Sequence, residues 1–98
     1  MIFVIDNLKW DTTKMELISD KCKYKISFSS NLLTIHYQED VFDVNIWKSN
    51  KGRWLITYRR AGFIKNSAQS LKENEVKDLL LKYDLSKYEE LFGELEEA

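Results

Sequence analysis

Proline is absent from this sequence of 98 residues, and glycine occurs only three times. Flexible linkers and low-complexity segments are usually rich in such residues, so the sequence contains no candidate linker. Its length is that of one typical domain. We therefore expect residues 1–98 to fold as a single domain.

Cysteine and histidine each occur once, as Cys22 and His36. A single cysteine cannot form an internal disulfide, which is typical of a reducing compartment. One cysteine and one histidine are too few for a zinc site, and no glycine cluster suggests a phosphate-binding loop. His36 falls on the polar side of a predicted strand, and no serine or cysteine forms a motif with it. We expect no metal, no other cofactor and no enzymatic activity.

Long apolar runs are also missing. Residues 1–5 are apolar but end at Asp6, and they lack the basic start and the length of a signal peptide. No stretch reaches the roughly 18–20 apolar residues that a membrane span requires. The sequence predicts a soluble, cytoplasmic protein.

The net charge of −1 conceals a strong asymmetry along the chain. Residues 1–72 hold 12 Lys and Arg and 7 Asp and Glu, whereas residues 73–98 hold 3 Lys and 9 Asp and Glu. The first part is therefore positive and the second negative. Such a dipolar surface can steer a charged partner, although it says nothing about the fold.

The hydrophobic pattern predicts strands first and helices last. Residues 2–5 and 8–10 suggest a hairpin. The capping-box spacing of Thr13 and Glu16 predicts a short helix to about Asp20, with Asp11 or Thr12 as the alternative cap. Alternating apolar and polar residues predict four strands joined by short turns, within residues 24–28, 32–37, 42–47 and 54–59. Residues 61–69 form the predicted loop.

Helical periodicity dominates the end of the chain. Apolar residues recur at helical spacing within 76–83 and again within 88–95. Ser70 with Glu73 and Ser86 with Glu89 have the capping-box spacing that marks a helix start. We predict an α+β fold: a four-stranded antiparallel meander, preceded by a hairpin and a short helix, with two C-terminal helices packed on one face.

Residues 48–65 carry basic side chains without an acid, and aromatic side chains are interleaved with them. Basic and aromatic residues together can contact nucleic acid, or anchor a protein interface. Alternatively, Trp54 and Tyr58 belong to the core, and Lys51 and Arg53 only solubilise a hairpin tip. Both interpretations remain open. The candidate basic contacts are Lys48, Lys51, Arg53, Arg59 and Arg60.

Carboxylates are concentrated in the C-terminal helices. Their spacing is typical of solvated helix faces and favourable helix-start charges. A negative helical surface can also occupy a groove built for a nucleic-acid backbone. The candidate acidic contacts are Glu89, Glu90 and Glu94.

Three segments of the sequence resemble a group of small proteins from Gram-positive phages, plasmids and conjugative elements. Residues 8–12, Leu-Lys-Trp-Asp-Thr, precede a predicted helix as they do in that group. Residues 47–55 form a Lys-Gly hairpin between aromatic residues. The C-terminal segment 88–98, Tyr-Glu-Glu-Leu-Phe-Gly-Glu-Leu-Glu-Glu-Ala, is the most specific of the three.

Some members of that group are similar to anti-CRISPR proteins or to their genetic neighbours. The resemblance implies a protein of a phage or mobile element that binds a type II CRISPR effector nuclease, with or without guide RNA. Stoichiometric binding would then block the loading of guide or target DNA. The alternative is a small nucleic-acid-binding accessory or regulatory protein. Exposed strand edges are compatible with a monomer or a homodimer.

Overall fold

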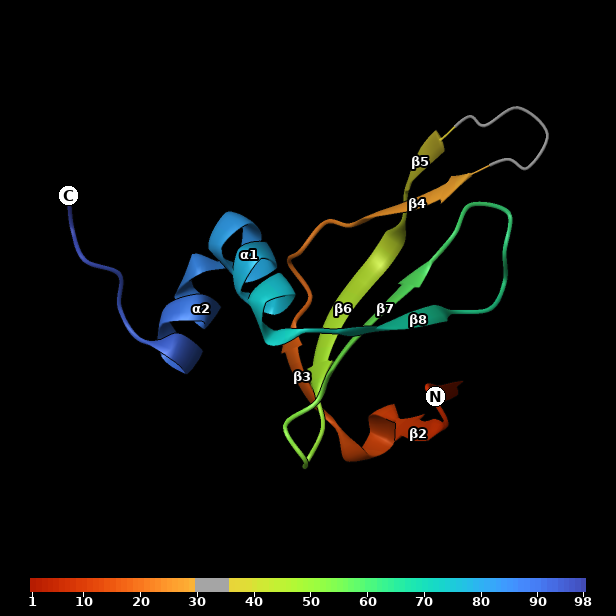
Figure 1. Ribbon diagram of the computed structural model, residues 1–98, viewed down its shortest axis with the longest axis horizontal. Helices are drawn as coiled ribbons and strands as arrows, with labels where there is room; N and C mark the ends of the chain where they lie inside the picture. The colour runs from red at the N-terminus through yellow and green to blue at the C-terminus, as the bar shows by residue number, and fades with distance from the viewer. Residues whose placement is uncertain (30–35) are drawn as a thin grey trace.

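The α+β class predicted from the sequence is confirmed by a computed structural model, which describes residues 1–29 and 36–98. The described residues form antiparallel strands followed by two helices (Figure 1). The strands are β1 (Ile2–Ile5), β2 (Leu8–Asp11), β3 (Glu16–Ser19), β4 (Lys25–Ser29), β5 (His36–Asp40), β6 (Phe42–Lys48), β7 (Trp54–Arg59) and β8 (Ser67–Leu71). The helices are the 3₁₀ helix η1 (Thr12–Lys14), α1 (Glu73–Tyr83) and α2 (Leu85–Phe92).

The centre of the molecule is a four-stranded antiparallel sheet with the order β3-β6-β7-β8. Of its two middle strands, β7 is buried along residues 54–58, whereas β6 buries the alternate residues Val44 and Ile46. Ile46 of β6 lies opposite Ile56 of β7, and Trp54 lies opposite Leu71 of β8. Directly opposed residues share a face of the sheet, so these four side chains point to the same side.

That face is covered by the helices, as predicted. Val76 and Leu80 of α1 are completely buried in one hydrophobic cluster with Ile46, Ile56 and Tyr58. Phe92 of α2 joins the cluster, and its ring centroid lies 6.2 Å from that of Trp54. The helical apolar stripe and the apolar sheet face therefore bury each other, which is the usual reason for a two-layer α+β arrangement.

The N-terminal hairpin β1–β2 lies over the other face of the sheet. Ser70, which is opposite Leu55 in the register, donates a hydrogen bond of 3.4 Å to Asp6 in the hairpin turn. Asp6 and Asn7 both have positive φ angles, of 54° and 61°, as a tight hairpin of the mirror-image turn type requires. The predicted hairpin is confirmed.

The predicted helix from Thr13 to Asp20 is wrong. Asp11 caps only the single turn of η1, by accepting a hydrogen bond from the Thr13 amide, and the chain then enters β3. A helix of about two turns is marginal by itself. Pairing with β6 gives the backbone of β3 hydrogen-bond partners along one edge and places Ile18 in the core.

The four-stranded sheet contains different strands from those predicted. β4 and β5 pair only with each other, as a separate hairpin, and Figure 1 shows that this hairpin extends beyond the sheet. The edge positions belong to β3 and to β8. The turn and strand expected within residues 30–35 lie outside the described residues. The turn expected at 38–40 is instead the end of β5.

The predicted loop 61–69 is also partly wrong, because residues 67–71 form β8. Both predicted helix starts need correction too. Ser70 lies in β8, and α1 begins after Lys72, whose amide donates to Glu75. Ser86 lies inside α2, which Asp84 caps by accepting from the Lys87 amide.

Candidate functional site

The basic run 48–65 is divided into two groups by β7. Lys51 and Arg53 lie at the β6–β7 turn, whereas Arg59, Arg60 and Lys65 follow the other end of the strand. β7 has six residues, so its ends are roughly 20 Å apart at the usual rise of a strand. The basic candidates within residues 48–65 therefore fall into two groups at opposite ends of β7.

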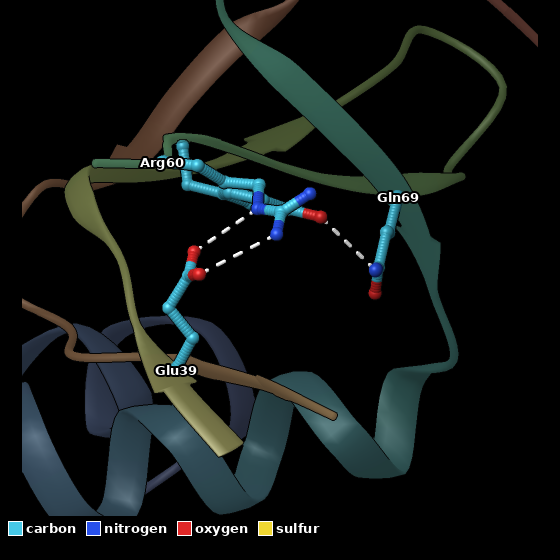
Figure 2. Close-up of polar contacts among 4 residues, drawn as sticks. Glu39, Arg60 and Gln69 are labelled. Atoms are coloured by element: carbon cyan, nitrogen blue, oxygen red, sulfur yellow. Dashed lines mark hydrogen bonds and ion pairs between the residues drawn. The ribbon is translucent and has the colours of Figure 1, made fainter. Parts of the chain in front are cut away.

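Arg60 is held in a structural ion pair. Its Nε lies 3.0 Å from Oε2 of Glu39 and its Nη2 lies 3.4 Å from Oε1, as Figure 2 shows. The guanidinium also lies over the rings of Phe63 and Phe28, at 4.8 and 5.6 Å. The hydrogen bonding that Arg60 donates to the Glu39 carboxylate is the main cause of the raised pKa of Arg60. These contacts tie β5 to the end of β7, so Arg60 is engaged within the protein itself.

The other candidates near the sheet are also partly engaged. Arg59 lies 3.4 Å from Asp43 in an exposed ion pair, and Lys48 lies over the ring of Trp54 at 5.0 Å. Trp54 and Tyr58 are buried, in agreement with the core interpretation of the aromatic residues. The half-buried Trp47 donates to the hydroxyl of Thr57 at 2.9 Å.

Lys51 and Arg53 line a pocket together with two other cations, and the sequence did not predict this arrangement. A pocket of about 390 Å³ lies between the N-terminal hairpin and the β6–β7 turn. Its wall includes Lys9 from β2 and Lys14 from η1, together with Lys51 and Arg53. We call it the basic pocket. The antiparallel pairing of Glu16 with Lys48 brings the segment before β3 alongside this turn.

A network of backbone hydrogen bonds fixes the turn that carries Lys51 and Arg53. Ser49 donates to the Arg53 carbonyl at 2.8 Å, and Gly52 donates to the Ser49 carbonyl at 2.9 Å. The Ser49 hydroxyl accepts from the Arg53 amide at 3.1 Å. Gly52 has a φ of +80°, a conformation that a side chain would strain. Two cations are thus presented from a defined backbone.

Asp11 is the one carboxylate in the wall of the basic pocket. It accepts hydrogen bonds from the hydroxyl and the amide of Thr13, at 2.7 and 3.1 Å. The hydroxyl bond is the main cause of its lowered pKa, and Lys14 contributes to the same effect. Asp11 therefore stays ionised, and both hydrogen bonds from Thr13 go to the same carboxylate oxygen, Oδ1.

The acidic candidates lie at the C-terminal end. Glu90 pairs with Lys87 at 2.7 Å, and Glu89 is half-buried on α2. Glu94 belongs to the segment after Gly93, where α2 ends and where the remaining residues are exposed. Figure 1 shows that this segment extends away from the sheet and the helices. We call residues 94–98 the acidic tail.

The buried polar residues form a structural cluster. The Ser19 hydroxyl donates to Oδ2 of Asp84 at 2.6 Å and lies 3.8 Å from Sγ of Cys22. Burial raises the pKa of the Cys22 thiol, which makes it a poor nucleophile at neutral pH. The cluster joins β3 to the junction of α1 and α2.

Within residues 1–29 and 36–98, no group of three or more His, Cys, Asp or Glu side chains is arranged to hold a metal ion. No helix among those residues is long and apolar enough to cross a membrane. Comparison with protein-family models, curated proteins and solved structures finds no match to this chain.

Proposed function

We propose that this chain is an anti-CRISPR protein of a phage or mobile element, which acts in the cytoplasm of the bacterial host. It binds a type II CRISPR effector nuclease stoichiometrically and blocks the loading of guide RNA or target DNA. It performs no chemistry on its partner. The resemblance of its N-terminal, hairpin and C-terminal segments to small proteins of such elements supplies the class of partner.

The observation that carries this proposal is the acidic tail. Glu94, Glu96 and Glu97 are exposed beyond the last helix, on a segment that extends from the body of the protein. CRISPR effectors hold the guide–target heteroduplex in a positively charged channel. Carboxylates that enter such a channel pair with the lysines and arginines that otherwise hold phosphates, so the tail competes with nucleic acid.

The first test is co-elution of the purified protein with a panel of type II effectors, with and without guide RNA, followed by target cleavage. We expect a stable complex and loss of cleavage with at least one effector. A complex that forms only without guide RNA identifies guide loading as the blocked step. Unchanged cleavage across the panel, without co-elution, would overturn the proposal.

Neutralising the acidic tail tests the contact surface. In the triple variant Glu94→Gln, Glu96→Gln, Glu97→Gln, three exposed ion pairs worth about 0.5 kcal/mol each are lost, so affinity for the effector should fall roughly tenfold. The matched control neutralises three exposed carboxylates elsewhere, as Glu16→Gln, Asp20→Asn, Asp78→Asn. Equal losses in both variants would mean that only net charge matters and that the tail is no contact.

A further inference from the structure

We infer that the basic pocket binds the phosphate backbone of a nucleic acid strand. This site is separate from the acidic tail, and it needs no CRISPR effector. Two of its four cations, Lys51 and Arg53, were candidates from the sequence. The other two, Lys9 and Lys14, are recognised only because the fold places them in the same pocket.

The basic pocket has a strong positive charge. Four cations and one carboxylate line the basic pocket, which gives its wall a formal charge of +3. The carboxylate, Asp11, is already hydrogen-bonded to Thr13. An anion in the pocket would relieve the mutual repulsion of the cations, and phosphate is the anion that clustered lysine and arginine side chains most often bind.

Among the residues that the structure describes, the cations of the basic pocket differ from several others in lacking a carboxylate partner. Lys25, Arg59, Arg60 and Lys87 each lie within ion-pair distance of a carboxylate. In the part of the chain that the structure describes, the four cations of the basic pocket form no such pair, and all four are exposed. Their charge is directed to solvent and is available to a ligand.

The backbone on both sides of the basic pocket is held by hydrogen bonds. Thr12 holds the start of the chain, because its hydroxyl accepts from the Met1 amine at 2.9 Å and its amide donates to the Met1 carbonyl at 2.9 Å. The hydrogen-bonded turn at Gly52 holds the opposite wall. A ligand therefore meets walls whose backbone is already ordered, which lowers the entropic cost of binding.

The surface available to phosphate is small and is bounded by carboxylates. Its volume of about 390 Å³ is at the small end of the range for ligand pockets. A neighbouring depression shares Leu8, Trp10 and Arg53 with it but contains the carboxylates Asp6 and Glu73. These carboxylates repel phosphate and so limit the phosphate-binding surface to the basic pocket. Arg53, at the boundary, can grip a phosphate with two parallel hydrogen bonds.

The test is fluorescence anisotropy with a short labelled single-stranded RNA and the DNA of the same sequence, over a series of salt concentrations. If four phosphates are neutralised, the logarithm of the affinity should fall with the logarithm of salt with a slope of about −3. The double variant Lys51→Gln, Arg53→Gln should reduce that slope to about −1.4, because two contacts are lost.

The matched control is the double variant Lys21→Gln, Lys65→Gln. Both lysines are exposed, and they follow the ends of β3 and β7 that lie away from the basic pocket. The same charge is removed, so the salt slope should stay near that of the parent protein. The midpoint of urea unfolding should be unchanged in both variants, because every substituted side chain is exposed.

Equal binding of RNA and DNA would support recognition of the backbone alone, and tighter binding of RNA would add a contact to the 2′-hydroxyl. Three results would overturn the proposal. One is no binding of either strand at low salt, and another is the same slope in the pocket and control variants. The third is displacement of the strand by inorganic phosphate at the strand's own concentration, which would define a simple anion site.

Discussion

Removal of the Asp84 carboxylate should destabilise the protein through two separate losses. Asp84 is 8% exposed and caps α2, and its other oxygen accepts from Ser19, which is 4% exposed. Loss of an N-cap costs about 1 kcal/mol. A buried hydroxyl without its acceptor costs about 1–3 kcal/mol more. Asp84→Ala should therefore lower the free energy of unfolding by about 2–4 kcal/mol.

A double-mutant cycle separates the two losses. Ser19→Ala alone removes a hydrogen bond to a carboxylate, and its cost should be about 1.5–3 kcal/mol. When both residues are alanine, the hydroxyl without an acceptor no longer exists. The two single effects should then exceed the double effect by at least about 1 kcal/mol.

Urea unfolding followed by far-ultraviolet circular dichroism measures each variant, with an unchanged m-value as the sign of an intact fold. Asp78→Ala is the control, because Asp78 is exposed on α1 and its loss should change stability by no more than about 0.5 kcal/mol. Additive effects of Ser19→Ala and Asp84→Ala would refute the inference that this hydrogen bond anchors α2, and with it the acidic tail, to β3.

Three further outcomes follow from the packing. The buried Cys22 thiol, whose pKa is raised by burial, should react with a disulfide reagent at neutral pH far more slowly in the folded protein than in urea; equal rates would contradict its burial. Burial is also the main cause of the raised pKa values of Tyr24 and Tyr58. The contribution of these two tyrosines to stability is therefore complete below about pH 10, and it is lost as the pH rises through their folded-state pKa values. The urea midpoint should fall above about pH 10. A constant midpoint would refute this expectation. Gly52→Ala should cost about 1–2 kcal/mol, because the added methyl meets open space and only the positive φ is strained; an unchanged urea midpoint would contradict that strain.

The sequence predicted best the elements whose periodic apolar residues are buried in the core. β6 alternates because one of its faces lies against the helices, and Val76 and Leu80 recur because α1 has one buried stripe. In each case the local periodicity and the tertiary packing agree. The class of the fold could therefore be derived from the pattern alone.

The edge strands were missed because pairing, not composition, makes them strands. β8 has the sequence Ser-Ala-Gln-Ser-Leu, without a β-branched or aromatic residue, and of its side chains only Leu71 is fully buried. β3 follows a capping-box spacing that is typical of a helix. Nor does alternation identify a partner strand, which is why β4 and β5 were placed in the wrong sheet.

The same limit applies to the candidate site. A run of basic residues in the sequence predicts one patch only if the chain keeps them together. An extended strand separates the residues at its two ends. β7 separates Arg53 from Arg59 by its full length, and the ion pair with Glu39 then engages Arg60 at the far end. The basic pocket instead depends on the pairing of β3 with β6, because that register brings Lys14 beside the β6–β7 turn. Since β3 was predicted as part of a helix, no reading of the charge pattern alone could have placed those cations together.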